Sequence, residues 1–330
     1  MILTVTLNPC LHKIVTFRGA SAGGVVIRPV ESRFIGGGKG VNAARAARRL
    51  GGRVVALLSC GGQVGEILRE DLAREGLEFV AVPVARPTRM STIIHDAAGG
   101  TLREYLEGGA ALTRSEEELF RSSFLSLLGR ADLVSLNGSV PDPGLNGFHA
   151  WAVERCNEAG KKVIVDTYGP AAVLAAEQGP YVLKANLEEV RSSFGCEADT
   201  RSKRAEFVRP LLERSTSRVL LTGGARGAWL FSSDEQMRVI PPSVKEVNPV
   251  GSGDAMLGAL LALLDAGASW TEALRMGAAA GAANAARAGV CDFEQEEVER
   301  LRKSVKVEIA GPGQPAEEMG DAHLFHGLLD

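Results

Sequence analysis

Short apolar runs and amphipathic stretches alternate along most of the 330-residue chain. The strand-like runs, rich in β-branched or other apolar residues, cover residues 2–7, 54–59, 133–136, 162–165, 181–184, 219–222 and 228–231. The helix-like stretches cover residues 40–50, 67–75, 115–128, 144–159, 187–194, 203–212, 253–266, 270–288 and 294–306. Strands separated by helices of this length predict parallel βαβ units, with helices on both faces of one sheet.

Two segments interrupt this alternation. Residues 12–34 and 88–107 read as short strands with glycine turns and no helix between them. They predict a small antiparallel sheet that projects from the main body, which is typical of a lid over a site or of a dimer contact. The residues from 311 to 330 are rich in Gly, Pro and acidic side chains, which predicts a loosely ordered tail.

Composition limits the classes of function. A hydrophobic fraction of 45%, a charged fraction of 23% and a net charge of −3 without a basic block argue against a nucleic-acid partner. The N-terminus reads as a strand without the basic region of a signal peptide, and the apolar stretch 255–264 is too short to span a bilayer. Five scattered cysteines favour reduced thiols over a zinc site. We therefore expect a soluble cytoplasmic protein with no membrane partner.

The strongest local signal is the segment 248–254, which reads Asn-Pro-Val-Gly-Ser-Gly-Asp and leads directly into a helix-like stretch. The small residues Gly251, Ser252 and Gly253 allow a tight turn whose free N–H groups form a pocket for an anion, such as a transferring phosphoryl group. Asp254 lies in the first turn, where a carboxylate is stabilised and can face a bound hydroxyl. The alternative is an ordinary helix start, but the small residues on the following helix face favour a close-packed functional turn.

A second glycine cluster, residues 36–40, reads Gly-Gly-Gly-Lys-Gly and opens an alanine-rich helix. It is not a Walker A loop, because that motif needs Ser or Thr directly after its Gly-Lys, and here Gly40 and then Val41 follow Lys39. The loop is nevertheless suited to hold a polar ligand against its backbone, with Lys39 and Asn42 facing the ligand. A tight turn before a well-packed helix is the alternative.

Two further segments are ambiguous by themselves. Asn186 and Glu189 follow a strand and share one helix face, where they suit either a hydrated Mg²⁺ or a capping box. Residues 221–228 read Leu-Thr-Gly-Gly-Ala-Arg-Gly-Ala, which predicts a hairpin over which a nucleotide can lie.

Taken in this order, these segments resemble the ribokinase-like, or PfkB, family of carbohydrate kinases. Residues 37–44, with Gly51 and Gly61 downstream, are similar to the N-terminal signature of the family, and residues 248–261 are similar to its C-terminal signature. The resemblance implies a ribokinase-like three-layer α/β/α fold with a mostly parallel central sheet and a small antiparallel β lid. It also implies one kinase domain over residues 1–310, with the two interrupting segments as lid strands.

Within this family, the chain is most similar to the branch that acts on phosphorylated ketohexoses. The similar segments are residues 6–9, 36–40, 138–141 and 248–254. The resemblance implies an enzyme that uses ATP and Mg²⁺ to phosphorylate an acceptor such as tagatose-6-phosphate, fructose-1-phosphate or fructose-6-phosphate. The alternatives are a kinase of an unphosphorylated sugar or nucleoside, and a non-catalytic relative that binds sugar phosphate.

The family's site residues carry over onto matching positions. Asp254 would be the base, and the N–H groups of Gly251, Ser252 and Gly253 would form the anion hole. The implied substrate-binding residues are His12, Arg28, Gly38, Lys39, Asn42, Arg89 and Ser139. The implied ATP-binding residues are Lys184, Thr222, Gly224, Gly227 and Asn284. Asn186 and Glu189 would hold Mg²⁺ through water, and the lid is compatible with a homodimer contact.

Two positions depart from the family pattern. His12 stands where the branch usually has Asp, so an imidazole replaces a carboxylate that would accept bonds from sugar hydroxyls. This departure puts the identity of the sugar in doubt. Ala185 replaces a usual Pro between Lys184 and Asn186, which loosens a turn without removing a chemical group.

Overall fold

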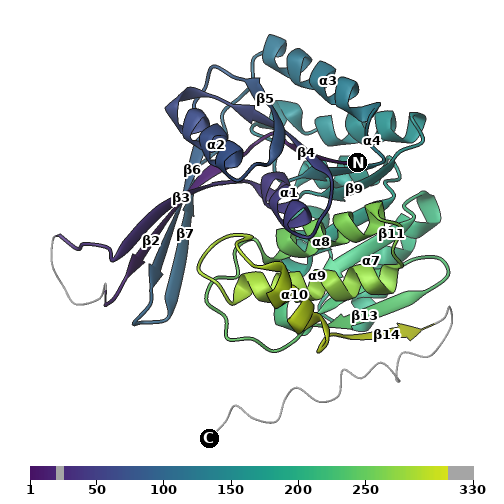
Figure 1. Cartoon of the computed structure of the whole chain (residues 1–330). Helices are drawn as coiled ribbons and strands as arrows, with labels where there is room; N and C mark the ends of the chain where they lie inside the picture. The colour runs from purple at the N-terminus through teal and green to yellow at the C-terminus, as the bar shows by residue number, and fades with distance from the viewer. Residues whose placement is uncertain (20–25, 311–330) are drawn as a thin grey trace, which may run out of the picture.

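The computed structural model describes residues 1–19 and 26–310, which contain a large sheet and a small one (Figure 1). Within these residues the large sheet has ten strands. Their spatial order is β14 (Lys306–Ala310), β13 (Gln236–Ile240), β12 (Ala228–Phe231), β11 (Arg218–Thr222), β10 (Val182–Asn186), β9 (Lys162–Asp166), β8 (Leu133–Asn137), β1 (Ile2–Thr6), β4 (Val54–Cys60) and β5 (Glu78–Pro83). Neighbouring strands from β11 to β5 pair in parallel, and β12, β13 and β14 add antiparallel pairs at one end.

Helices cover both faces of the large sheet, which makes three layers (Figure 1). The first face is covered by α1 (Lys39–Arg49), α8 (Ser252–Asp265), α9 (Trp270–Ala285) and α10 (Gln295–Arg302), and α2 (Gly62–Arg74) adds its buried leucines to the same core. The opposite face is covered by α3 (Arg114–Leu128), α4 (Phe148–Glu158), α5 (Pro170–Ala176), α6 (Leu187–Phe194) and α7 (Arg201–Arg214). The strands are buried on both faces, as the continuous apolar runs of the sequence require.

The small sheet projects from one side of the body (Figure 1). Its order is β3 (Glu31–Gly37), β2 (Cys10–Phe17), β6 (Arg89–Asp96) and β7 (Thr101–Leu106). The outer pairs, β2–β3 and β6–β7, are antiparallel, as predicted, whereas the middle pair β2–β6 is parallel. Strand β3 runs into α1 within two residues, so the lid is joined directly to the glycine-lysine loop.

Several element boundaries differ from the prediction. The helix predicted over residues 144–159 divides into the 3₁₀ turn η1 (Pro143–Leu145) and α4, and the helix predicted over 294–306 ends at Arg302. Strands β5, β13 and β14 were not predicted. Two of them, β5 and β14, are sheet edges with several half-exposed or exposed residues, so their apolar pattern is weak.

Two further predictions concern the C-terminal tail and membrane-spanning helices. The loosely ordered tail predicted for residues 311–330 lies outside the described residues. In the part of the chain that the structure describes, no helix is both long and apolar enough to cross a membrane.

Candidate active site

The turn before α8 is held in place by two buried asparagines. Asn248 Nδ2 donates to the Ala288 carbonyl (2.9 Å), and Asn284 Nδ2 donates to the Val250 carbonyl and to Ser252 Oγ (both 2.9 Å). Gly251 adopts a φ of 82°, and a β-carbon there would lie 2.5 Å from a Val290 methyl group, so only glycine fits. These bonds give Asn284 a structural position behind the turn.

The amide groups of this turn are only partly engaged. The Ser252 N–H donates to the Pro249 carbonyl (3.1 Å). Among the described residues, the N–H groups of Gly251 and Gly253 have no acceptor. These two amides at the start of α8 can therefore receive an anion.

Asp254 is the buried carboxylate of the turn, with 7% of its surface exposed. Its Oδ2 accepts a hydrogen bond from Nδ2 of Asn42 in the first turns of α1 (2.8 Å). Burial raises the pKa of Asp254 to about 6, although Lys39 and the Asn42 bond act in the opposite direction. A carboxylate with this pKa is mostly ionised at neutral pH and can still accept a proton.

Two lysines and two further carboxylates surround this position. Lys39 Nζ lies 3.0 Å from Asp166 Oδ1 and 2.6 Å from Glu189 Oε1, and Lys184 Nζ lies 2.7 Å from Asp166 Oδ2. Burial alone lowers the pKa of Lys39, but Asp166, Glu189 and Asp254 outweigh it and raise the pKa. Burial likewise opposes the ionisation of Asp166, but the two lysines lower its pKa. Lys39 and Asp166 are therefore both charged near neutral pH.

Lys184, a predicted ATP-binding residue, lies next to the turn that leads into α8. Its Nζ is 3.5 Å from where a β-carbon of Gly253 would be, so it lies beneath the start of α8. The sequence reading missed its partner Asp166, which ends strand β9 and is fully buried. An available signal was its position at the carboxyl end of a predicted parallel strand, where ligands bind in such sheets.

Asn186 and Glu189 form the capping box that was one of the two predicted alternatives. The Glu189 N–H donates to Asn186 Oδ1 and the Asn186 N–H donates to Glu189 Oε2, both at 2.8 Å. The box aligns Glu189 so that its other oxygen meets Lys39. In the described residues, no group of three or more His, Cys, Asp or Glu side chains could hold a metal ion directly.

The remaining nucleotide candidates lie at one turn. Thr222 ends β11 next to Asn186 of β10, and the 3₁₀ turn η2 (Gly224–Arg226) connects it to β12. Gly224 and Gly227 have φ of 61° and 101°, which explains the glycines of this hairpin.

On the opposite side of the centre, His12 is a buried residue of β2. Its ring fills the space that a side chain at Gly37 would need. Burial, followed by the charges of Arg45 and Arg89, lowers the pKa of His12 to about 4, so the imidazole is neutral at pH 7. His12 Nδ1 is buried and has no hydrogen-bond partner in the described part of the chain.

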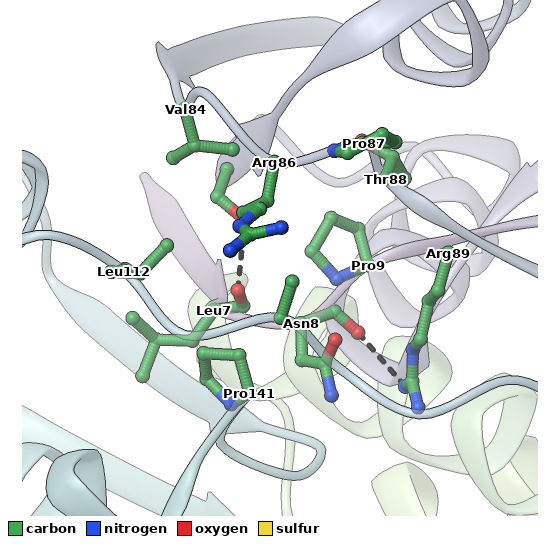
Figure 2. A pocket seen from close by; sticks show the side chains of 12 residues that line it. Leu7, Asn8, Pro9, Val84, Arg86, Pro87, Thr88, Arg89, Leu112 and Pro141 are labelled. Carbon is green, nitrogen blue, oxygen red and sulfur yellow. Dashed lines mark hydrogen bonds between the residues drawn. The ribbon is translucent and has the colours of Figure 1, made fainter.

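The phosphate-binding candidates Arg89 and Ser139 meet around Asn8. Arg89 Nη2 donates to the Asn8 carbonyl (3.0 Å), and Asn8 Nδ2 donates to Ser139 Oγ (3.1 Å). Figure 2 shows Arg89 and Arg86 beside a small hollow that Asn8 and Pro9 also line. Asn8 and Arg86 were not among the predicted site residues.

Gly38 and Arg28 are the last two candidates. Gly38 caps α1 with a φ of 105°, and a β-carbon there would lie 2.9 Å from Pro9 Cα. Arg28, in contrast, is exposed on the lid near Val30, whose N–H donates to the Thr16 carbonyl. Thr16 is six residues from Cys10 along β2, which is ~20 Å at the usual strand rise. The structure therefore does not bring Arg28 to the site of its own chain.

Comparisons with known proteins relate the whole chain to kinases of sugars and sugar phosphates. The sequence profile of the pfkB family carbohydrate kinases matches residues 5–297. A 1-phosphofructokinase from Haloferax volcanii is 32% identical over 84% of this chain and 88% of its own length. The ATP-dependent 6-phosphofructokinase isozyme 2 of Mycobacterium tuberculosis is 28% identical over 100% of this chain and 95% of its own.

Solved structures show the same fold. Phosphofructokinase-2 from Escherichia coli, in complex with substrates and products, superposes with a TM-score of 0.83 at 27% identity. The match covers 92% of this chain and 98% of that one. The fold expected from the sequence, a mostly parallel α/β/α sheet with a small lid sheet, is confirmed.

Proposed function

Since this chain belongs to the pfkB family of carbohydrate kinases, we propose that it transfers the γ-phosphoryl group of ATP to a hydroxyl of a phosphorylated ketohexose. One domain, residues 1–310, would carry the activity. The observation that supports it most strongly is Asp254, buried at the start of α8 beside two available amides and two ammonium groups. The relatives that support the acceptor class are named as phosphofructokinases.

In this proposal, Asp254 is the general base. Asn42 occupies Oδ2, which leaves Oδ1 to accept the proton of the acceptor hydroxyl as its oxygen bonds to phosphorus. The N–H groups of Gly251 and Gly253 receive the phosphoryl oxygens in transit, and Lys39 balances their charge. Catalysis is then mainly positioning and charge neutralisation of an in-line transfer.

The charged cluster suits a hydrated Mg²⁺ carried with the nucleotide. Three carboxylates, Asp166, Glu189 and Asp254, outnumber the ammonium groups of Lys39 and Lys184, so the cluster keeps a negative excess. Mg²⁺ retains most of its waters, and Glu189 and Asn186 would bind them without direct ligation. Bound there, the ion would neutralise the phosphate charges of ATP.

The nucleotide would lie along the carboxyl ends of β10 and β11. We assign Thr222, Gly224 and Gly227 to its path, with Lys184 at the phosphate end and Asn284 supporting the turn.

The five unpaired cysteines of the chain suit the reducing environment of the cytoplasm, where we place the enzyme.

Arg89 and Ser139 would bind the phosphate that the acceptor already carries. Arg28 is held away from the site of its own chain by the lid on which it lies. It belongs to this set only if the lid of one copy of the chain reaches the site of a second copy. Exposed apolar side chains on the lid support such a contact: Val26, Ile27, Val30, Phe34, Tyr105 and Leu106. A relative, phosphofructokinase-2 of Escherichia coli, has been solved in a tetrameric inhibited form. We therefore propose a homodimer through the lid.

The test is a panel of sugars and sugar phosphates screened for ATP consumption with Mg²⁺ present. We expect turnover with a phosphorylated ketohexose, and Asp254→Asn should lower kcat by about 10²–10⁴-fold. The matched control is Asp234→Asn, an exposed acid on a turn, which should leave kcat unchanged. Near-full activity of Asp254→Asn would remove it as the base. Turnover only with unphosphorylated acceptors, or calorimetric binding without ADP release, would favour the two alternative functions instead.

A further inference from the structure

Arg45 of α1 is a buried arginine at the meeting point of three elements, with 3% of its surface exposed. Its Nε lies 2.7 and 2.9 Å from the two carboxylate oxygens of Glu75, at the end of α2. Its Nη2 donates to the Gly36 carbonyl of lid strand β3 (2.6 Å), and its Nη1 donates to Asn42 Oδ1 (3.3 Å). A buried guanidinium with three kinds of acceptor has one well-defined orientation.

The bond to Asn42 determines which end of that amide faces Asp254. A guanidinium has only donors, so the oxygen of the Asn42 amide must face Arg45. The NH₂ group of Asn42 then points the other way, and it donates to Asp254 Oδ2 at 2.8 Å. A rotated Asn42 would place its oxygen against the carboxylate, where two acceptors repel each other.

We propose that Arg45 is a positioning residue that acts on the base Asp254 through Asn42. It fixes the amide so that one carboxylate oxygen is always occupied and the other is free for the acceptor hydroxyl. The inference deepens the proposed function and rests on Asp254 being the base.

The same guanidinium also holds the root of the lid. Gly36 donates its N–H to Asp71 Oδ2 (2.7 Å) and offers its carbonyl to Arg45, so both backbone groups are bound. Asp71 and Glu75 both belong to the α2 end. The position of the base and the entry of lid strand β3 into α1 are therefore set by one side chain.

The charged groups around Asp254 give a prediction for the pH profile. Lys39 of α1, Asp166 of β9 and Lys184 of β10 face it, and the Cys291 thiol and His12 nearby are neutral because burial shifts each pKa away from the charged form. The base must be ionised, so kcat/KM of the wild type should fall as the pH drops through about 6. Losing the Asn42 bond removes a contact that lowers the pKa of Asp254, so this acid limb should move to higher pH.

The experiment is a double-mutant cycle on kcat with Arg45→Met, Asn42→Ala and the combined variant. Arg45→Met alone should lower kcat about tenfold and move the acid limb upward, because coupled neighbours show interaction energies of that order. In the Asn42→Ala background the same substitution should change kcat less than twofold. The matched control is Arg74→Met, an exposed arginine paired with Asp71, which should change neither kcat nor the limb.

The outcomes separate this inference from the proposed function. Equal losses in both backgrounds, or an unmoved acid limb, would overturn the role of Arg45 while Asp254→Asn still abolishes turnover. An active Asp254→Asn variant would overturn both. If thermal unfolding shows that Arg45→Met is not folded at the assay temperature, Glu75→Gln is the variant to measure. It weakens the bonds that the half-exposed Glu75 makes to the Arg45 guanidinium. It should then shift the limb in the same direction by a smaller amount, and an unchanged limb would count against the proposal.

Discussion

Gly37 and His12 form a pair in which the absence of one side chain makes room for the other. The imidazole fills the space beside Gly37, and its burial, followed by the neighbouring charges of Arg45 and Arg89, lowers its pKa and keeps it neutral. A neutral imidazole offers a sugar one donor and one acceptor, whereas a carboxylate accepts several hydroxyl bonds. We therefore propose that His12 affects the selectivity for the sugar more than the rate of the transfer.

Replacing His12 by Asp tests this directly. His12→Asp should lower the KM for at least one phosphorylated ketohexose by about tenfold or more, because charge-assisted bonds contribute roughly 1.5–3 kcal/mol each. The kcat should change only a few-fold, since Asp254 is untouched. The matched control is His12→Asn, which has the same size without the charge, measured on the same panel of acceptors. A KM that is equal in both variants for every acceptor would show that the charge at this position is irrelevant.

At the scale of elements, the contact between α1 and α8 brings Asn42 and Asp254 together. The two helices approach closely at Gly258, where a β-carbon would lie 2.6 Å from Ala46 Cβ and would also overlap the Ala43 carbonyl. Ala43 follows Asn42 in the chain, so the spacing of the helices at Gly258 controls the hydrogen bond between Asn42 and Asp254.

Gly258→Ala should therefore destabilise the protein despite the better helix propensity of alanine. Overpacking of this kind costs about 1–3 kcal/mol of unfolding free energy, against a propensity gain of about 1 kcal/mol. Thermal and denaturant unfolding measure the loss, and kcat should fall with it. Gly129, at the end of α3, has a φ of −59° and no neighbour within 4 Å of a new β-carbon, so Gly129→Ala serves as the control. A Gly258→Ala variant as stable as Gly129→Ala would contradict the close-approach interpretation.

At the scale of the whole molecule, the proposed lid dimer would link the site to the state of assembly. Arg28 lies on the lid, away from Arg89 and Ser139 in the same chain. If two subunits form each site together, Arg28 on the lid of one subunit could bind the acceptor phosphate in the site of the other.

Mixing two variants tests the shared site. Arg28→Ala should raise the KM for the acceptor, and Asp254→Asn should lack turnover. In a mixed dimer, the Arg28→Ala subunit keeps its base and receives Arg28 from its partner. At an acceptor concentration below the wild-type KM, the co-refolded mixture should therefore exceed the summed activities of the separate variants. Strictly additive activities, or a monomer by light scattering, would contradict the proposed lid dimer.

Much of the fold was predictable because most of its strands are buried and separated by helices. Their apolar runs are continuous, and the intervening helices require parallel pairing. The edge strands β5 and β14 were missed because an edge strand exposes part of its residues, and the helix predicted over 294–306 included the first residue of β14. The pairing of β2 with β6 is a contact between distant segments, and its parallel direction was not visible in the local pattern.

The sequence by itself determined the family, the turn with Asp254 and the loop with Lys39, because glycines in these motifs are required by local backbone geometry. Only the tertiary structure decided which side chains form ion pairs or hydrogen bonds with one another. Asp166 joins Lys39 to Lys184 over separations of 127 and 18 residues, and Arg45 reaches Glu75, 30 residues away. Such partners come from the packing of separate elements, and burial then amplifies their electrostatic effect, which no local pattern encodes. For the turn at Asp254, the sequence specified the carboxylate, and the packing of α1 against α8 supplied the Asn42 contact and the raised pKa that suit it to act as a base.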